Sequence, residues 1–183
     1  MNIPAVIFMA VWAVAALCWF YGVAEFIGIR RLRPWAYRRG WVIVDRRLPL
    51  HLARPQGGTI ELREVKARTG PAGEIHFLAP APILSLRIRT PFPIKGTIEW
   101  SAPAPRIIGR LPVGTVAFLV AWLAAWTLGA WMGPGTGVSA LGFVLAGWGF
   151  AAALIAVSLP VELKRFARAQ ASLIEHLERA ERG

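Results

Sequence analysis

Charged side chains are nearly absent from two long stretches of this 183-residue chain. Residues 1–29 contain one, Glu25, and residues 111–161 contain none. The whole chain is 56% hydrophobic and 17% charged, whereas a soluble globular domain is about 25% charged. Uncharged apolar stretches of this length exclude an ordinary soluble protein and indicate a membrane protein.

Cysteine and histidine are also scarce. The one cysteine, Cys18, excludes an intrachain disulfide. The three histidines, His51, His76 and His176, do not occur at the spacing of a zinc-binding motif. The chain also lacks a glycine-rich phosphate-binding loop. We therefore expect no metal and no cofactor. The sequence identifies no catalytic residue. It therefore favours a protein without enzymatic activity, although it does not decide the point.

Three segments are long and apolar enough to cross a bilayer, which takes about 20 residues of helix. They are residues 3–29, 112–132 and 138–159. Residues 133–137, Gly-Pro-Gly-Thr-Gly, divide the uncharged run, and Gly and Pro at this density end a helix and allow a reversal. We predict a transmembrane helix in residues 1–29 and a helical hairpin in residues 111–159. The first helix is expected to be a retained anchor, because its opening residues lack the positive charge of a signal peptide.

The basic residues indicate the orientation of these helices. Sixteen of the 21 Lys and Arg lie in residues 30–110, and the other five lie in residues 160–183. Cytoplasmic flanks of membrane spans are enriched in Lys and Arg. We therefore expect the N-terminus outside, and the middle region and C-terminus in the cytoplasm. The predicted location is the inner membrane of a bacterium.

The middle region, residues 30–110, shows the period of two that is typical of half-buried strands. Five runs alternate or are rich in β-branched residues: 41–44, 59–63, 74–77, 84–89 and 97–100. Pro- and Gly-rich breaks between them predict a small antiparallel sheet or barrel. The alternation changes parity after Arg63, which we interpret as a bulge near Glu64. His76 alternates with apolar neighbours, so we expect it to face solvent.

The two ends of the β region carry other signals. Residues 101–105, Ser-Ala-Pro-Ala-Pro, are typical of a stiff linker back to the membrane. Residues 160–183 have apolar side chains at three- and four-residue steps, which predicts an amphipathic helix. Its charges nearly balance, so we expect it to pack on the β-domain, on a second copy of itself or on a partner.

Together these patterns predict a membrane protein of mixed α and β structure. It would have three transmembrane helices, with a small cytoplasmic antiparallel β-domain inserted between helices 1 and 2, and a C-terminal amphipathic helix. The parts are residues 1–29, 30–110, 111–159 and 160–183. The sequence shows no second soluble domain.

A dense basic cluster follows the first span. Its members are candidates for contact with lipid or a partner: Arg30, Arg31, Arg33, Trp35, Tyr37, Arg38 and Arg39. Each Lys or Arg near an anionic membrane surface contributes about 1 kcal/mol. Basic flanks also arise from topology alone, with Trp and Tyr at the interface. Nucleic acid is not expected as a partner, because no binding motif accompanies the charge.

Glu25 is the one acidic residue in a predicted span. Carboxylates inside membranes mark functional sites by default. Here Arg30 and Arg31 follow about one turn later, which places Glu25 at the level of the headgroups. We expect it to pair with one of these arginines or to bond to Tyr21, with a polar contact to a partner subunit as the alternative.

Small residues recur at four-residue steps in the second and third spans, where they allow helices to approach closely. The candidates for helix packing are Ala121, Ala125, Gly129, Gly142 and Ala146, with Gly147 and Ala151 as a further pair. They would close the protein's own hairpin or dock another membrane subunit.

The sequence therefore favours a non-catalytic accessory, scaffold or regulatory protein, a small subunit of a larger membrane assembly or a homo-oligomer. The alternative is a membrane enzyme or a protein that handles anionic lipids. In that case Glu25, Asp45 and the basic cluster would line a headgroup site. A transporter is poorly supported, because three spans with few polar residues form no pathway.

Overall fold

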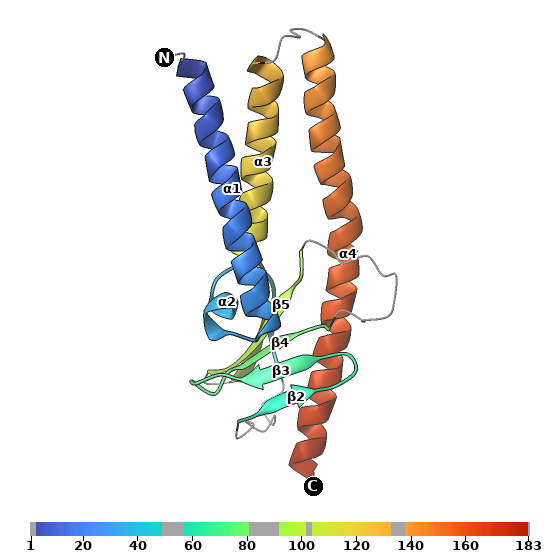
Figure 1. Cartoon of the computed structure of the whole chain (residues 1–183). Coiled ribbons are helices and arrows are strands. Elements are labelled where there is room, and N and C mark those ends of the chain that lie inside the picture. Colours follow the sequence, from blue (N-terminus) through green and yellow to red (C-terminus); the bar gives the residue numbers. More distant parts are fainter. Residues whose placement is uncertain (1–2, 49–56, 81–91, 102–103, 133–137, 183) are drawn as a thin grey trace.

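The computed structural model describes residues 3–48, 57–80, 92–101, 104–132 and 138–182. Three long helices run side by side at one end of the molecule, and a β-sheet with a short helix lies at the other (Figure 1). The chain order is two helices, six strands and two helices. The protein thus combines helices and a sheet, as the sequence predicts.

Three helices are long and apolar enough to cross a membrane. They are α1 (Ile3–Arg30), α3 (Val113–Met132) and α4 (Val138–Arg182). At 1.5 Å per residue, the 20 residues of α3 extend about 30 Å, which matches the hydrocarbon core of a bilayer. The expected turn at 133–137 lies outside the described residues. The ends of α3 and α4 that flank it lie at the same end of the molecule (Figure 1).

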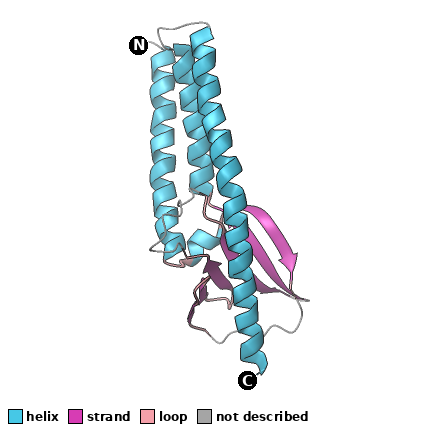
Figure 2. Cartoon of the chain, turned by 90° about the vertical axis from the view of Figure 1, so that its right-hand side faces the viewer, coloured by secondary structure: helices cyan, strands magenta, loops and turns pink. Residues whose placement is uncertain are grey.

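The third apolar segment and the amphipathic segment form one helix of 45 residues. No break separates them at residue 160, because α4 continues through Pro160. Proline has no N–H to donate to the preceding turn and usually kinks or ends a helix. Figure 2 shows that α4 nevertheless runs along the whole molecule as one helix.

The six strands form one antiparallel sheet in the order β1-β6-β5-β4-β3-β2. Their bounds are β1 Trp41–Arg47, β2 Thr59–Glu61, β3 Lys66–Thr69, β4 Ile75–Leu78, β5 Lys95–Ser101 and β6 Ala104–Leu111. Four of the five predicted strands are confirmed. The fifth, at 84–89, lies outside the described residues.

Two predictions from the sequence are wrong, because a hairpin joins the strands at each place. The parity change after Arg63 is not a bulge, because Glu61 pairs with Lys66 and the chain reverses between β2 and β3. The stiff linker at 101–105 is a hairpin as well, in which Ser101 pairs with Ala104. The register irregularity that the sheet does contain lies between Val42 and Val44 of β1.

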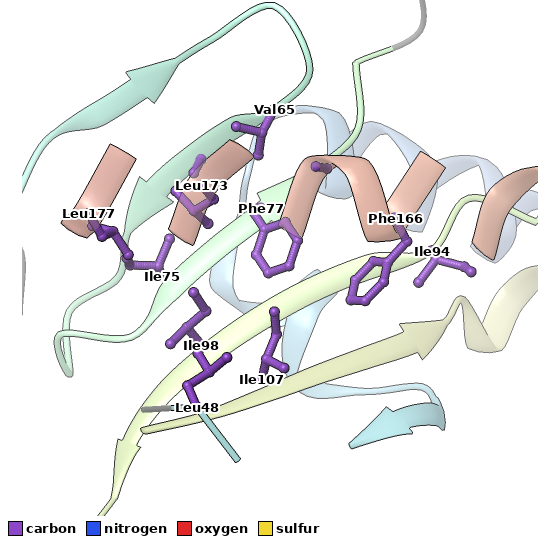
Figure 3. Close-up of a cluster of buried hydrophobic side chains, with 12 residues drawn as sticks. Leu48, Val65, Ile75, Phe77, Ile94, Ile98, Ile107, Phe166, Leu173 and Leu177 are labelled. Atoms are coloured by element: carbon purple, nitrogen blue, oxygen red, sulfur yellow. The ribbon is translucent and has the colours of Figure 1, made fainter. Parts of the chain in front are cut away.

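The core lies between one face of the sheet and the second half of α4. Buried side chains of the helix meet buried strand side chains in one cluster (Figure 3). The labelled members are Leu48, Val65, Ile75, Phe77, Ile94, Ile98, Ile107, Phe166, Leu173 and Leu177. The rings of Phe77 and Phe166 stack with centroids 5.4 Å apart. Packing of the amphipathic segment on the β-domain, one of the three expected outcomes, is thus confirmed.

A glycine in the neighbouring strand leaves room for the ring of Phe77 in this stack. Phe77 lies directly over Gly96 of the neighbouring strand, and a Cβ there would fall 2.1 Å from the phenyl ring. The helical stripe that faces the core is Phe166, Ala169, Leu173 and Leu177. Two apolar side chains of the same segment, Leu163 and Ala167, are exposed.

The opposite face of the sheet is covered by α2 (Pro34–Arg38) and the end of α1. The chain leaves α1 through a Schellman motif, with N–H of Arg33 donated to Gly28 O and N–H of Leu32 to Ile29 O. Leu32 takes the left-handed position with φ 51°, which costs a non-glycine residue about 1 kcal/mol. Its burial against Ile29 and Tyr37 offsets that strain.

Candidate functional site

Glu25 lies at the point where the helices meet the sheet, and its side chain is 1% exposed. Its carboxylate accepts hydrogen bonds from the backbone N–H groups of Val113, at 3.2 Å, and Gly114, at 2.6 Å. These are the first residues of α3, whose N–H groups have no partner within their own helix. The carboxylate of α1 therefore caps α3 and complements the positive end of its dipole.

Lys95, from the first position of β5, completes this site. Its Nζ lies 2.5 Å from Glu25 Oε1 and also donates to Ala36 O of α2. The side chain of Lys95 is fully buried. Burial lowers the pKa of Lys95, and the Glu25 carboxylate opposes that shift. One ion pair thus joins α1, α2, α3 and β5, and we call these groups the junction.

Two glycines bring the helices close enough for the junction to form. A Cβ on Gly114 would lie 2.5 Å from the Cα of Gly22, so α1 and α3 touch backbone to backbone there. Gly22 lies one turn before Glu25, which places the carboxylate next to the start of α3. A larger residue at either position would separate the acceptor from its donors.

The expected partners of Glu25 are wrong. Its carboxylate bonds to Lys95 and to α3, instead of to Arg30, Arg31 or Tyr21. Arg30 lies over the ring of Phe26 at 4.9 Å. No local pattern predicts this pair, because Lys95 is 70 residues away and falls between predicted strands.

Substitution of one junction partner should destabilise the protein strongly. We expect Glu25→Gln or Lys95→Met to lower the free energy of unfolding by about 3–5 kcal/mol, because each leaves the other group buried without its counter-ion. The double variant should lose much less than the sum of the two single losses. Denaturation of the full-length protein in mild detergent measures this. The control is the exposed pair Glu61 and Lys66, for which Glu61→Gln should cost less than about 1 kcal/mol. Additive losses at the junction would contradict the coupling.

The basic cluster divides into exposed and buried members. The guanidinium-bearing residues Arg30, Arg31, Arg33, Arg38 and Arg39 are all exposed, as is Trp35. Tyr37 is fully buried: its hydroxyl donates to Ile29 O, and its ring stacks on His76. Burial raises the pKa of Tyr37 well above its usual value. Its side chain is therefore unavailable to a lipid headgroup.

The small residues of the second and third predicted spans differ in their burial and in their neighbours. Ala125 is buried, and Gly129 faces Phe8 of α1. Gly147 lies under Trp126 of α3, where a Cβ would meet the indole at 2.3 Å. Gly142 and Ala146 are exposed, with open space around Gly142. Ala121 contributes to an apolar groove of about 650 Å³ between α1 and α3.

His76 is 1% exposed, so the expectation that it faces solvent is wrong. The alternation placed it correctly on the face opposite Phe77, but that face is covered by α2. Its ring stacks on Tyr37 with centroids 4.8 Å apart. Within the part of the chain that the structure describes, neither ring nitrogen has a hydrogen-bond partner; the carboxylate oxygen Oε1 of Glu74 lies 3.4 Å from Nε2.

A cavity of about 290 Å³ opens beside this histidine, and we call it the polar pocket. Its charged and polar side chains are Arg38, Glu74, His76, Thr97, Glu99 and Arg110. Burial lowers the pKa of His76, and the positive charges of Arg38 and Arg110 act in the same direction, whereas Glu74 opposes them. His76 is therefore held in its neutral form in the folded protein.

The burial of His76 predicts a loss of stability in mild acid. In the unfolded chain its pKa is near 6.5. Because the folded pKa is lower, the unfolded state binds more protons below that value, and stability falls as the pH drops through this window. His76→Phe, which retains a ring over Tyr37, should flatten the dependence of Tm on pH between about 5 and 7. His176→Gln on α4 is the control and should follow the wild type. An unchanged profile in His76→Phe would contradict the assignment.

Other candidates for chemistry lie apart. Asp45 pairs with Arg106 across β1 and β6, and this guanidinium lowers the pKa of Asp45. Glu61 pairs with Lys66, away from Asp45. Within the described residues, no group of three or more His, Cys, Asp or Glu has the arrangement of a metal site. His51 lies outside the described residues.

No protein-family model, curated protein or solved structure matches the chain.

Proposed function

We propose that this chain is a non-catalytic accessory protein of a larger membrane assembly, in which it holds the sheet in a fixed position against the membrane. The observation that supports this most directly is the junction. Lys95 of the sheet, Glu25 of α1 and the start of α3 are bonded to one another in a buried network. A flexible tether would need no such contact, so its presence favours a scaffold.

The second connection between membrane and sheet is α4, which runs from the apolar bundle to the core without a break. Two attachments on opposite faces of the sheet prevent it from rotating relative to the helices. On the positive-inside rule, the sheet and the C-terminus lie on the cytoplasmic side of an inner membrane.

The partner surface that we propose is the face of α4 turned away from α3. Gly147 and Ala151, one turn apart, pack toward α3. Opposite them, Gly142, Ala146, Gly149 and Ala153 are exposed at three- and four-residue steps. Helices in membranes associate through such small residues, since their backbones then approach closely. A transmembrane helix of a partner, or of a second copy, fits this ridge.

A matched pair of substitutions tests the ridge. Ala146→Leu lies on it, whereas Ala152→Leu is exposed but lies about 120° from Ala146 around the helix. We expect Ala146→Leu to abolish co-purification of the partner, or dimerisation, in mild detergent, and Ala152→Leu to preserve it. Both variants should unfold like the wild type, because both positions are exposed. A protein that is purified from native membranes as a lone monomer would contradict the proposal.

The exposed arginines favour a second candidate function, recognition of anionic lipid. Arg30, Arg31 and Arg33 lie around the end of α1, where a membrane surface would begin. Substitution of all three by Gln should reduce the number of anionic lipids retained in native mass spectrometry, at about 1 kcal/mol for each lost charge. The control removes three exposed arginines of the sheet, Arg46, Arg63 and Arg68. Equal lipid retention in the two triple variants would rule out a dedicated lipid site.

A further inference from the structure

The polar pocket contains a buried imidazole whose hydrogen-bonding groups are unused. Neutral histidine has one N–H donor and one acceptor nitrogen. Among the described residues, neither nitrogen of His76 has a hydrogen-bond partner, although the residue is 1% exposed. A buried polar group without a partner is destabilising. The ring of His76 lines the pocket but its nitrogens are covered, so a bound molecule reaches them only after a small movement of the neighbouring side chains.

The other polar groups of the pocket are close together but weakly bonded. Arg38 lies 3.8 Å from Glu74, and Arg110 lies 3.6 Å from Glu99 and 3.5 Å from the Thr97 hydroxyl. Charge-assisted hydrogen bonds normally measure about 2.7–2.9 Å. Both arginines thus form long ion pairs with the carboxylates, and Glu74 also accepts a hydrogen bond from the backbone N–H of Ala72 at 2.9 Å. The long pairs leave room for a closer ligand contact.

The charges of the pocket indicate what it accommodates. It has two guanidinium groups, from Arg38 and Arg110, and two carboxylates, from Glu74 and Glu99. A simple anion would be repelled by the carboxylates, and a simple cation by the guanidinium groups. A molecule that carries both charges complements both sets.

We propose that the polar pocket binds a small zwitterion, with an ammonium group on one side and a carboxylate or phosphate group on the other. The anionic group of the ligand binds the guanidinium groups of Arg110 and Arg38, next to the Thr97 hydroxyl. The ammonium group binds the carboxylates of Glu74 and Glu99, and the long Arg38–Glu74 and Arg110–Glu99 contacts open to admit it. The volume of about 290 Å³ equals that of about ten water molecules, which suits an amino acid or an aminoalkyl phosphate. This inference is independent of the proposed scaffold role.

The experiment uses the full-length protein in detergent and calorimetric titration with defined probes. The zwitterions are the twenty standard amino acids and phosphoethanolamine. Inorganic phosphate and ethylammonium serve as controls that carry one charge each. We expect at least one zwitterion to bind with a Kd below about 1 mM, and each single-charge probe to bind at least tenfold more weakly.

Phosphoethanolamine also occurs as a lipid headgroup, so the source is tested separately. The titration with phosphoethanolamine is repeated in nanodiscs of phosphatidylethanolamine and of phosphatidylglycerol. If phosphoethanolamine binds more weakly in phosphatidylethanolamine nanodiscs than in phosphatidylglycerol nanodiscs, the lipid headgroup competes for the pocket and is the source of the ligand. Equal binding in both identifies a free ligand. Either result supports the proposal, because the chemistry of the pocket is the same.

Substitutions locate the binding. Thr97→Val keeps the shape of the side chain and removes the hydroxyl, and Arg38→Gln removes one charge; each should weaken binding about tenfold, which corresponds to one lost hydrogen bond to a charged group. Arg39→Gln is the control, because Arg39 is the exposed neighbour of Arg38 but does not line the pocket. Thermal unfolding confirms that each variant is folded.

Three results would overturn the proposal. The first is the absence of saturable binding by any zwitterion up to about 10 mM, which would show that the pocket holds water only. The second is binding of phosphate alone as tightly as of the zwitterions. The third is a Kd that changes equally in Arg38→Gln and Arg39→Gln.

Discussion

The junction of Glu25 and Lys95 is the constraint on which the rest of the structure depends. A buried carboxylate and a buried ammonium group are each expensive to remove from water, and they are tolerated only when their partners are present. Here the partners come from four elements: α1, α2, β5 and the start of α3. The sheet therefore cannot shift relative to the helices without leaving a charge unpaired. This requirement accounts for Gly114 at the point where α1 and α3 cross, since a Cβ there would lie 2.5 Å from the Cα of Gly22 and push the donors away from the carboxylate.

The two faces of the sheet have different roles. One is apolar and is covered by α4, which supplies most of the core around Phe77 and Phe166. The other carries Lys95, His76, Thr97 and Arg110, alternating with the core residues along β4, β5 and β6. The short helix α2 covers only part of that second face. The polar side chains at the edge of α2 are thus partly covered and line the polar pocket. Concave sites with a few polar groups are where small molecules usually bind.

Much of the fold follows from the sequence, because the dominant signals are local. Apolar length predicts the spans, and alternation predicts four of the strands and the two faces of the sheet. The hairpins at β2–β3 and β5–β6 were missed, because a change of parity and a Pro-rich turn have other common interpretations. The site was less predictable. The pair of Glu25 and Lys95 depends on a contact across 70 residues. The burial of His76 depends on α2, whose position no local pattern determines.

The continuity of α4 has a consequence for the order in which the protein is made. The strands are synthesised before α3 and α4, yet the side chains that cover their apolar face, Phe166 to Leu177, come from the last part of the chain. Until the second half of α4 has been synthesised, the apolar face of the sheet is uncovered. The sheet can therefore reach its final fold only after this part of α4 has left the ribosome.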